Sequence, residues 1–147
     1  MFLNICLIIL AVFVEISFSG NDCQTVKQLS QVLNKRIKTP TKEIGNVLLE
    51  DIEKFNDILW EIREAIRDGN STVMEDIKPI INATLPSFVA TYEILAKKIN
   101  KEKRKELYRS FNWTEEARKR FEFLCVDAKF QWETLQVIYD LRIKNII

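Results

Sequence analysis

Histidine is absent from the 147 residues of this chain, and glycine, proline and cysteine are scarce, with three of each. Without histidine the chain cannot form Ser-His or Cys-His nucleophile pairs, His-ligated metal sites or a histidine pH switch. Carboxylate-only and lysine-based mechanisms survive this exclusion, but no residue pattern supports either. We therefore expect no enzymatic activity, no cofactor and no metal site.

A surplus of one charge is also lacking, because 22 Lys and Arg residues stand against 21 Asp and Glu residues. Nucleic-acid-binding proteins usually carry a strong basic surplus, so we expect no nucleic-acid partner. None of the acidic clusters has the alternating oxygen ligands and glycine of a calcium loop. Scarce glycine and proline leave few turns, which favours long helices over many short strands.

The first residues form an apolar run that ends in a candidate cleavage site. Residues 1–16 are almost wholly apolar, and Ser17-Phe18-Ser19 places small residues at both positions that a signal peptidase reads. The run of about 14 residues is shorter than the roughly 20 that a membrane-spanning helix needs. We predict a removed signal peptide at 1–19 and one secreted, extracellular helical domain at 20–147, with no integral membrane segment after cleavage. An uncleaved anchor is the alternative, because no Lys or Arg precedes the run and Glu15 lies near its end.

Two cysteines remain after the predicted cleavage, since Cys6 lies within the leader. Two cysteines in an exported domain usually pair, so we predict a disulfide between Cys23 and Cys125. It would close a loop of about 100 residues and stabilise the fold by roughly 4–5 kcal/mol in the chain-entropy description. Buried free thiols or an intermolecular bridge are the alternatives.

Apolar residues recur at helical spacing through most of the remaining chain. The pattern predicts helices at about 23–37, 40–68, 71–81, 86–111 and 113–143. The last of these carries two apolar stripes, one containing Phe121 and Trp132 and the other containing Phe123 and Phe130. A helix that is apolar on two sides is usually buried by several neighbours. We therefore predict an antiparallel bundle of four to five helices with the C-terminal helix at its centre.

Three Asn-X-Ser/Thr motifs without a central proline begin at Asn70, Asn82 and Asn112. Each match alone is weak, because the motif is short. All three fall at predicted helix breaks in a chain with a predicted export signal, and glycans need exposed turns. We therefore predict N-glycosylation at the three asparagines. The prediction is weakest for Asn112, which is followed by the large Trp113 and which a helix cap could also use.

A run of six cationic residues lies in the second half of the chain, followed by Arg118, Lys119 and Arg120 after the next turn. It is a candidate docking face for a sulfated glycan, a lipid headgroup or an acidic protein patch. The alternative is a solvated helix face that neighbouring glutamates partly neutralise. The run comprises Lys97, Lys98, Lys101, Lys103, Arg104 and Lys105.

The many aromatic residues either fill the core or line a cavity for lipid between helices, and core filling is the commoner use. Trp60 lies beside the main stripe of its helix and is a candidate anchor for a partner. Together these patterns predict a secreted, glycosylated helical protein that recognises an unknown extracellular partner protein, in the manner of an effector or cytokine. The alternative is an extracellular carrier of fatty acids or other small apolar ligands.

Overall fold

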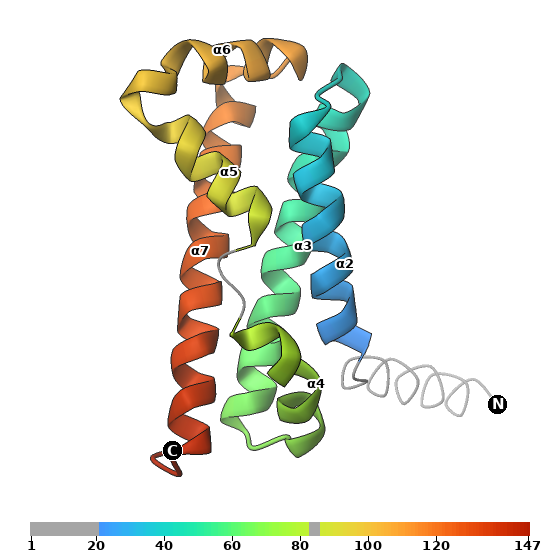
Figure 1. The fold of residues 1–147 in the computed structure, drawn as a ribbon. Coiled ribbons are helices and arrows are strands. Elements are labelled where there is room, and N and C mark those ends of the chain that lie inside the picture. The colour runs from blue at the N-terminus through green and yellow to red at the C-terminus, as the bar shows by residue number, and fades with distance from the viewer. Residues whose placement is uncertain (1–20, 83–85) are drawn as a thin grey trace, which may run out of the picture.

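The computed structural model describes residues 21–82 and 86–147, and all the regular elements in these ranges are helices (Figure 1). The all-α prediction is therefore confirmed for the described part of the chain, whereas the predicted signal peptide lies outside it. The elements are α2 (Asn21–Lys38), α3 (Lys42–Arg67), α4 (Ser71–Ile81), α5 (Ser87–Ala96), the short 3-10 helix η1 (Lys98–Asn100), α6 (Lys101–Ser110) and α7 (Glu115–Ile143).

Side-chain caps fix where three of the helices begin. Thr41 Oγ1 accepts a hydrogen bond from the Ile44 amide at the start of α3, and Asn70 Oδ1 accepts one from Val73 at the start of α4. Thr114 Oγ1 caps α7 in the same way, at 3.2 Å from the Ala117 nitrogen. Each cap satisfies a backbone donor that has no partner within the helix.

The single helix predicted over 86–111 is wrong, because the chain bends sharply between α5 and α6. Lys97 adopts an extended backbone (ψ 141°), and η1 follows it. Two side chains then bond to carbonyls in the last turn of α5. Asn100 Nδ2 donates to Ile94 O at 2.8 Å, and Arg104 Nη1 donates to Leu95 O at 2.7 Å. These bonds compensate the interrupted helix ladder and turn α6 across the end of the molecule (Figure 1).

The helices α3 and α7 form the most extensive pair, and they run in the same direction. Near their starts the Trp113 indole donates to Gly45 O at 3.0 Å, and midway Asn56 Nδ2 donates to Leu124 O at 3.0 Å. Near their ends Arg142 Nε donates to Ile66 O. The fully antiparallel arrangement predicted from the sequence is therefore wrong. The segment between them, α4 to α6, carries the chain back to the end where α3 begins (Figure 1).

The centre of the molecule is α3 rather than the C-terminal helix. Helices α2, α4 and α7 all pack against α3, and Figure 1 shows it between α2 and α7. α2 runs antiparallel to it, since Arg36 near the end of α2 pairs with Asp51 in the first half of α3. The side of α3 that faces these helices is apolar and buried, as expected of a helix with neighbours on several sides. Its buried members include Leu48, Ile52, Phe55, Leu59, Ile62 and Ile66.

Aromatic rings fill the core near the α6 end. Phe121 is 1% exposed, and its ring centroid lies 5.1 Å from that of Trp113, 5.5 Å from Tyr92 and 6.2 Å from Tyr108. Phe111 stacks on Trp113 at 4.5 Å. Edge-to-face and offset contacts of this kind stabilise beyond the apolar area that they bury.

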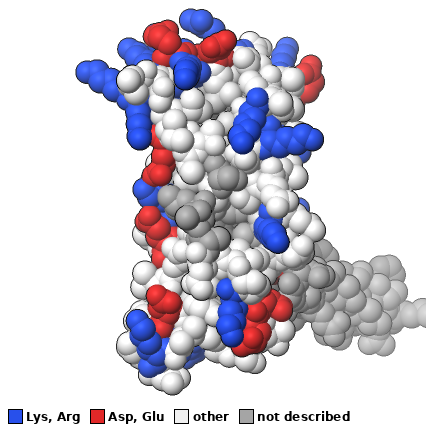
Figure 2. Space-filling view, viewed as in Figure 1, with Lys and Arg blue, Asp and Glu red and all other residues white. Residues whose placement is uncertain are grey.

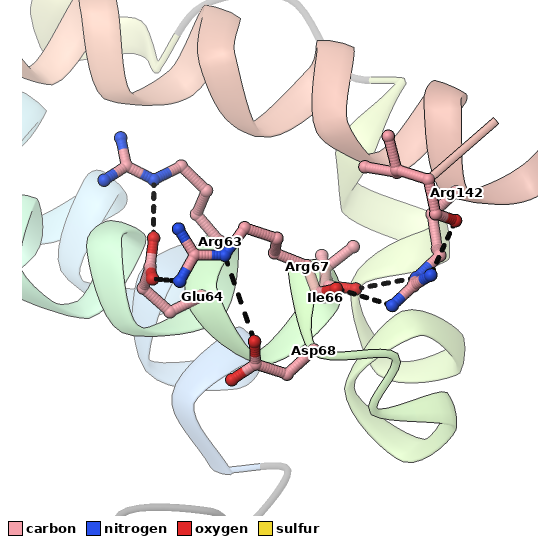
Figure 3. Close-up of polar contacts among 7 residues, drawn as sticks. Arg63, Glu64, Ile66, Arg67, Asp68 and Arg142 are labelled. Atoms are coloured by element: carbon pink, nitrogen blue, oxygen red, sulfur yellow. Dashed lines mark hydrogen bonds and ion pairs between the residues drawn. The ribbon is translucent and has the colours of Figure 1, made fainter.

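Arg142 joins the C-terminal ends of α3 and α7 (Figure 3). Its guanidinium donates to the carbonyls of Ile66 and Arg67, which belong to the last turn of α3. Gly69 follows with φ +82°, the left-handed conformation that commonly ends a helix. A Cβ at Gly69 would lie 2.9 Å from Arg142 Nη2, so glycine also leaves the room that this contact needs.

Candidate functional site

The predicted disulfide is absent, and Cys23 and Cys125 are buried free thiols. Cys23 lies near Asp22 and Asp76, whose charges add to the burial that raises its pKa to about 12. Burial and then the charge of Glu122 raise the pKa of Cys125. The prediction failed because α2 packs mainly on α3, α5 and α4, so its cysteine does not face α7. Protonated, buried thiols are poor nucleophiles, which keeps both cysteines unreactive.

The three predicted glycosylation sites lie at helix ends, and their modification stays a prediction. Asn70 is the cap of α4, and its Oδ1 is the acceptor, so the Nδ2 atom that carries a glycan is not needed for the cap. Asn82 follows α4 and is exposed, but Thr84 of its motif lies outside the described residues. Asn112 is exposed in the turn before α7, with φ +53°, and does not cap that helix.

The predicted cationic run is divided among three elements. Lys97 ends α5 and lines a surface hollow with Tyr92, Glu93 and Ile94. Lys98 belongs to η1, and the remaining four residues belong to the first half of α6. These four residues do not all lie on one face of α6, because side chains two residues apart on a helix point in directions about 200° apart. Lys101 and Lys105 therefore share a face that Lys103 does not.

A basic groove lies between α6 and the first turns of α7, and we use this name for two adjoining hollows of about 420 and 260 Å³. Both hollows are lined by Lys105, Tyr108 and Arg118. The first hollow contains no carboxylate among its lining residues, whereas the second includes Glu115 and Glu122. The other lining residues are Arg109, Asn112 and Trp113 in the first hollow and Lys101, Arg104 and Lys119 in the second.

Tyr108 lines both hollows, is 6% exposed and is held on two sides. Its hydroxyl donates to Glu122 Oε1 at 2.8 Å, and the Arg118 guanidinium carbon lies 6.0 Å from its ring centroid. Burial, followed by the hydrogen bond to Glu122, raises the pKa of Tyr108. The phenol is therefore neutral, and the positive charge around it is not cancelled by a phenolate.

The second apolar stripe of α7 is exposed, which contradicts the expectation that neighbours bury it. Phe121 and Phe123 are two residues apart and so lie on nearly opposite faces of the helix. The face of Phe121 packs into the core, whereas that of Phe123 has no covering helix among the described residues. We call this second face the α7 stripe. Its members are Phe123 (68% exposed), Val126 (59%), Phe130 (59%) and Val137 (57%).

In residues 21–82 and 86–147, no group of three or more Cys, Asp or Glu side chains lies close enough together to hold a metal ion. No helix in these ranges is long and apolar enough to span a bilayer. No family model matches the chain, and comparison with curated proteins and with solved structures found no match. The arguments for function therefore come from the basic groove and the α7 stripe themselves.

Proposed function

We propose that this chain is an exported, glycosylated helical protein that recognises an extracellular partner protein through the α7 stripe. The observation that carries the proposal is the stripe itself, with two phenylalanines and two valines more than half exposed on one helix face. Contiguous exposed apolar surface is costly in water and commonly marks a contact site. Aromatic residues are also enriched where partner proteins bind.

The spacing of the stripe suits a partner that presents an amphipathic helix. Phe123, Phe130 and Val137 recur every seven residues, and Val126 stands three residues after Phe123. This is the pattern of a seam that packs against a second helix. The residues three positions after Phe130 and Val137 are Glu133 and Asp140, and both are exposed.

These two acids specify the partner further. In a parallel pair of two copies, Glu133 and Asp140 would face their own counterparts, and like charges repel. A different protein that carries apolar residues along the seam and Lys or Arg opposite the two acids avoids this cost. We therefore assign the stripe to a partner helix of that composition rather than to a second copy of this chain.

Export and glycosylation belong to the same proposal. Residues 1–19 have the composition of a signal peptide, and Asn70, Asn82 and Asn112 begin acceptor motifs. Asn82 and Asn112 are exposed, and Asn70 retains a free Nδ2 atom while its oxygen caps α4. None of the three asparagines belongs to the α7 stripe, so glycans and a partner helix would not share attachment points.

Site-specific photo-crosslinking tests the proposal. A photoreactive residue at position 130 should form an adduct with a protein from the fluid surrounding the producing cells, and the crosslinked peptide should have an amphipathic helical pattern. Phe123→Glu should abolish the adduct, because a charge would then be buried against the apolar seam. The matched control is a photoreactive residue at Val32, which is 40% exposed on α2 and should give no such adduct.

Equal adducts from positions 32 and 130, or none from position 130, would contradict partner recognition through this face. An adduct at position 130 that consists of two copies of this chain would replace the proposed partner with self-association.

A further inference from the structure

One segment of this chain carries an excess of positive charge. Residues 97–120 contain ten Lys and Arg and four Glu, a net charge of +6, whereas the whole chain carries +1. The rest of the chain therefore carries −5. Figure 2 shows Lys and Arg side chains projecting from the α6 end, at the top of the view, with some acidic side chains between them. Such a separation of charge directs an anionic ligand toward this end.

The basic groove arranges part of this charge in a row. Lys101, Lys105 and Arg109 stand four residues apart on α6, so they lie on one helix face and span about 12 Å at 1.5 Å per residue. Arg118 and Lys119 line the opposite side of the groove from α7. The row therefore presents several separated positive charges rather than a single convergent anion site.

Three of these cations lie outside the close ion pairs of the described part of the chain, and the charges of Glu102 and Glu115 reach them only at longer range. Lys105 pairs with Glu102 at 3.0 Å, and Lys119 pairs with Glu115 at 2.9 Å. Lys101, Arg109 and Arg118 form no ion pair with any described carboxylate. Arg118 is nevertheless held in place, because it lies over the Tyr108 ring and its Nε bonds to Thr114 O.

We propose that the basic groove binds a sulfated polysaccharide. A linear chain with sulfate groups at regular intervals matches a row of cations along a groove, and guanidinium groups can bind such oxyanions in a bidentate manner. A flat bilayer surface would reach the rim of a groove but not its interior. This function does not depend on the α7 stripe, because the groove and the stripe share no residue.

Asn112 connects this proposal to glycosylation, because it lines the first hollow of the groove. A glycan on Asn112 would lie at one end of the row and restrict access to Arg109. Binding should therefore be measured for protein carrying the Asn112 glycan and for protein lacking it, with stronger binding for the latter.

The test measures binding of heparin to the protein over a range of salt concentrations. The groove variant is Lys101→Gln with Arg109→Gln, and the matched control is Lys98→Gln with Lys103→Gln, which removes the same charge from the same end outside the groove. All four residues are exposed, so neither pair should disturb the fold, and circular dichroism checks this. We expect the groove variant to bind about tenfold more weakly and the control to change less than threefold.

The salt dependence should change as well, with a slope of log affinity against log salt that is lower by roughly one to two for the groove variant. Equal weakening by both double variants, or no heparin binding by the unaltered protein at physiological salt, would overturn the proposal. Binding to vesicles containing phosphatidylserine but not to heparin would replace it with membrane docking, in which the exposed Ile99 takes part.

Discussion

At the scale of single residues, Gly45 controls how closely the turn before α7 approaches α3. A Cβ on this residue would lie 2.9 Å from both the Cβ and the carbonyl oxygen of Phe111, and 3.0 Å from Trp113 Nε1. The same approach allows the Trp113 indole to donate to the Gly45 carbonyl. A glycine within a helix normally costs stability, so its presence here reflects packing.

Replacement of Gly45 by alanine should lower the free energy of unfolding by about 1–3 kcal/mol, because backbone would have to move away from the new methyl group. Urea denaturation measures the change. The exposed neighbour Asn46 is the control, and Asn46→Ala should change stability by less than about 0.5 kcal/mol. A gain of about 1 kcal/mol for Gly45→Ala, as in an unobstructed helix, would contradict the close approach.

Neither cysteine should react with a thiol reagent at pH 8 in the folded protein, and both should react in denaturant. Burial favours the protonated thiol of Cys23 in the folded state and raises its pKa from 9.0 to about 12. The associated stability is therefore present below pH 9 and is lost as the pH rises toward 12. Absence of reactive thiols even in denaturant would demonstrate the disulfide that the structure lacks.

The absence of a bridge between Cys23 and Cys125 was not predictable from composition. The number of cysteines and the predicted export both favoured a bridge, but the sequence does not specify which helices are neighbours. After burial, the charge of Asp76 on α4 contributes to the raised pKa of Cys23, whereas Cys125 contributes to the raised pKa of Tyr92 on α5. The two thiols therefore lie between different pairs of helices. Only the three-dimensional packing distinguishes these environments.

At the scale of helices, periodicity predicted four of the five segments, but it did not indicate that only one of the two apolar faces of α7 is buried. The two stripes of α7 have the same spacing and similar hydrophobicity, and only the one containing Phe121 and Trp132 meets α3. The relative direction of α3 and α7 also depends on the route of α4 to α6. The bend at Lys97 determines that route, and no proline or glycine in the sequence marks it.

Two phenylalanines of α7 provide a direct test of this assignment of faces. Phe121→Ala should lower the free energy of unfolding by about 3–5 kcal/mol, because it leaves a cavity among packed aromatic rings. Phe123→Ala should change it by less than about 0.5 kcal/mol, because the side chain is 68% exposed. Denaturant titration of both variants gives the comparison. Similar losses for the two would mean that the assigned faces are wrong.

At the scale of the whole molecule, the groove and the α7 stripe are separate surfaces with different chemistry. One is cationic and lies at the α6 end, and the other is apolar and runs along α7. Of the six residues predicted as a cationic docking face, three line the groove (Lys101, Arg104 and Lys105) and three do not (Lys97, Lys98 and Lys103). Arg109, which the prediction left out, also lines it. Arg118 and Lys119, which the sequence places after the next turn, line the same groove from α7.

Export is the claim on which both proposed surfaces depend, since their ligands lie outside the cell. Intact-mass analysis with N-terminal sequencing, after expression of the full chain in secretory cells, tests this claim most directly. We predict protein in the medium that begins at Gly20 and loses mass in more than one step on treatment with an N-glycosidase. Protein retained in the cytosol, beginning at Met1 and carrying no glycan, would contradict it.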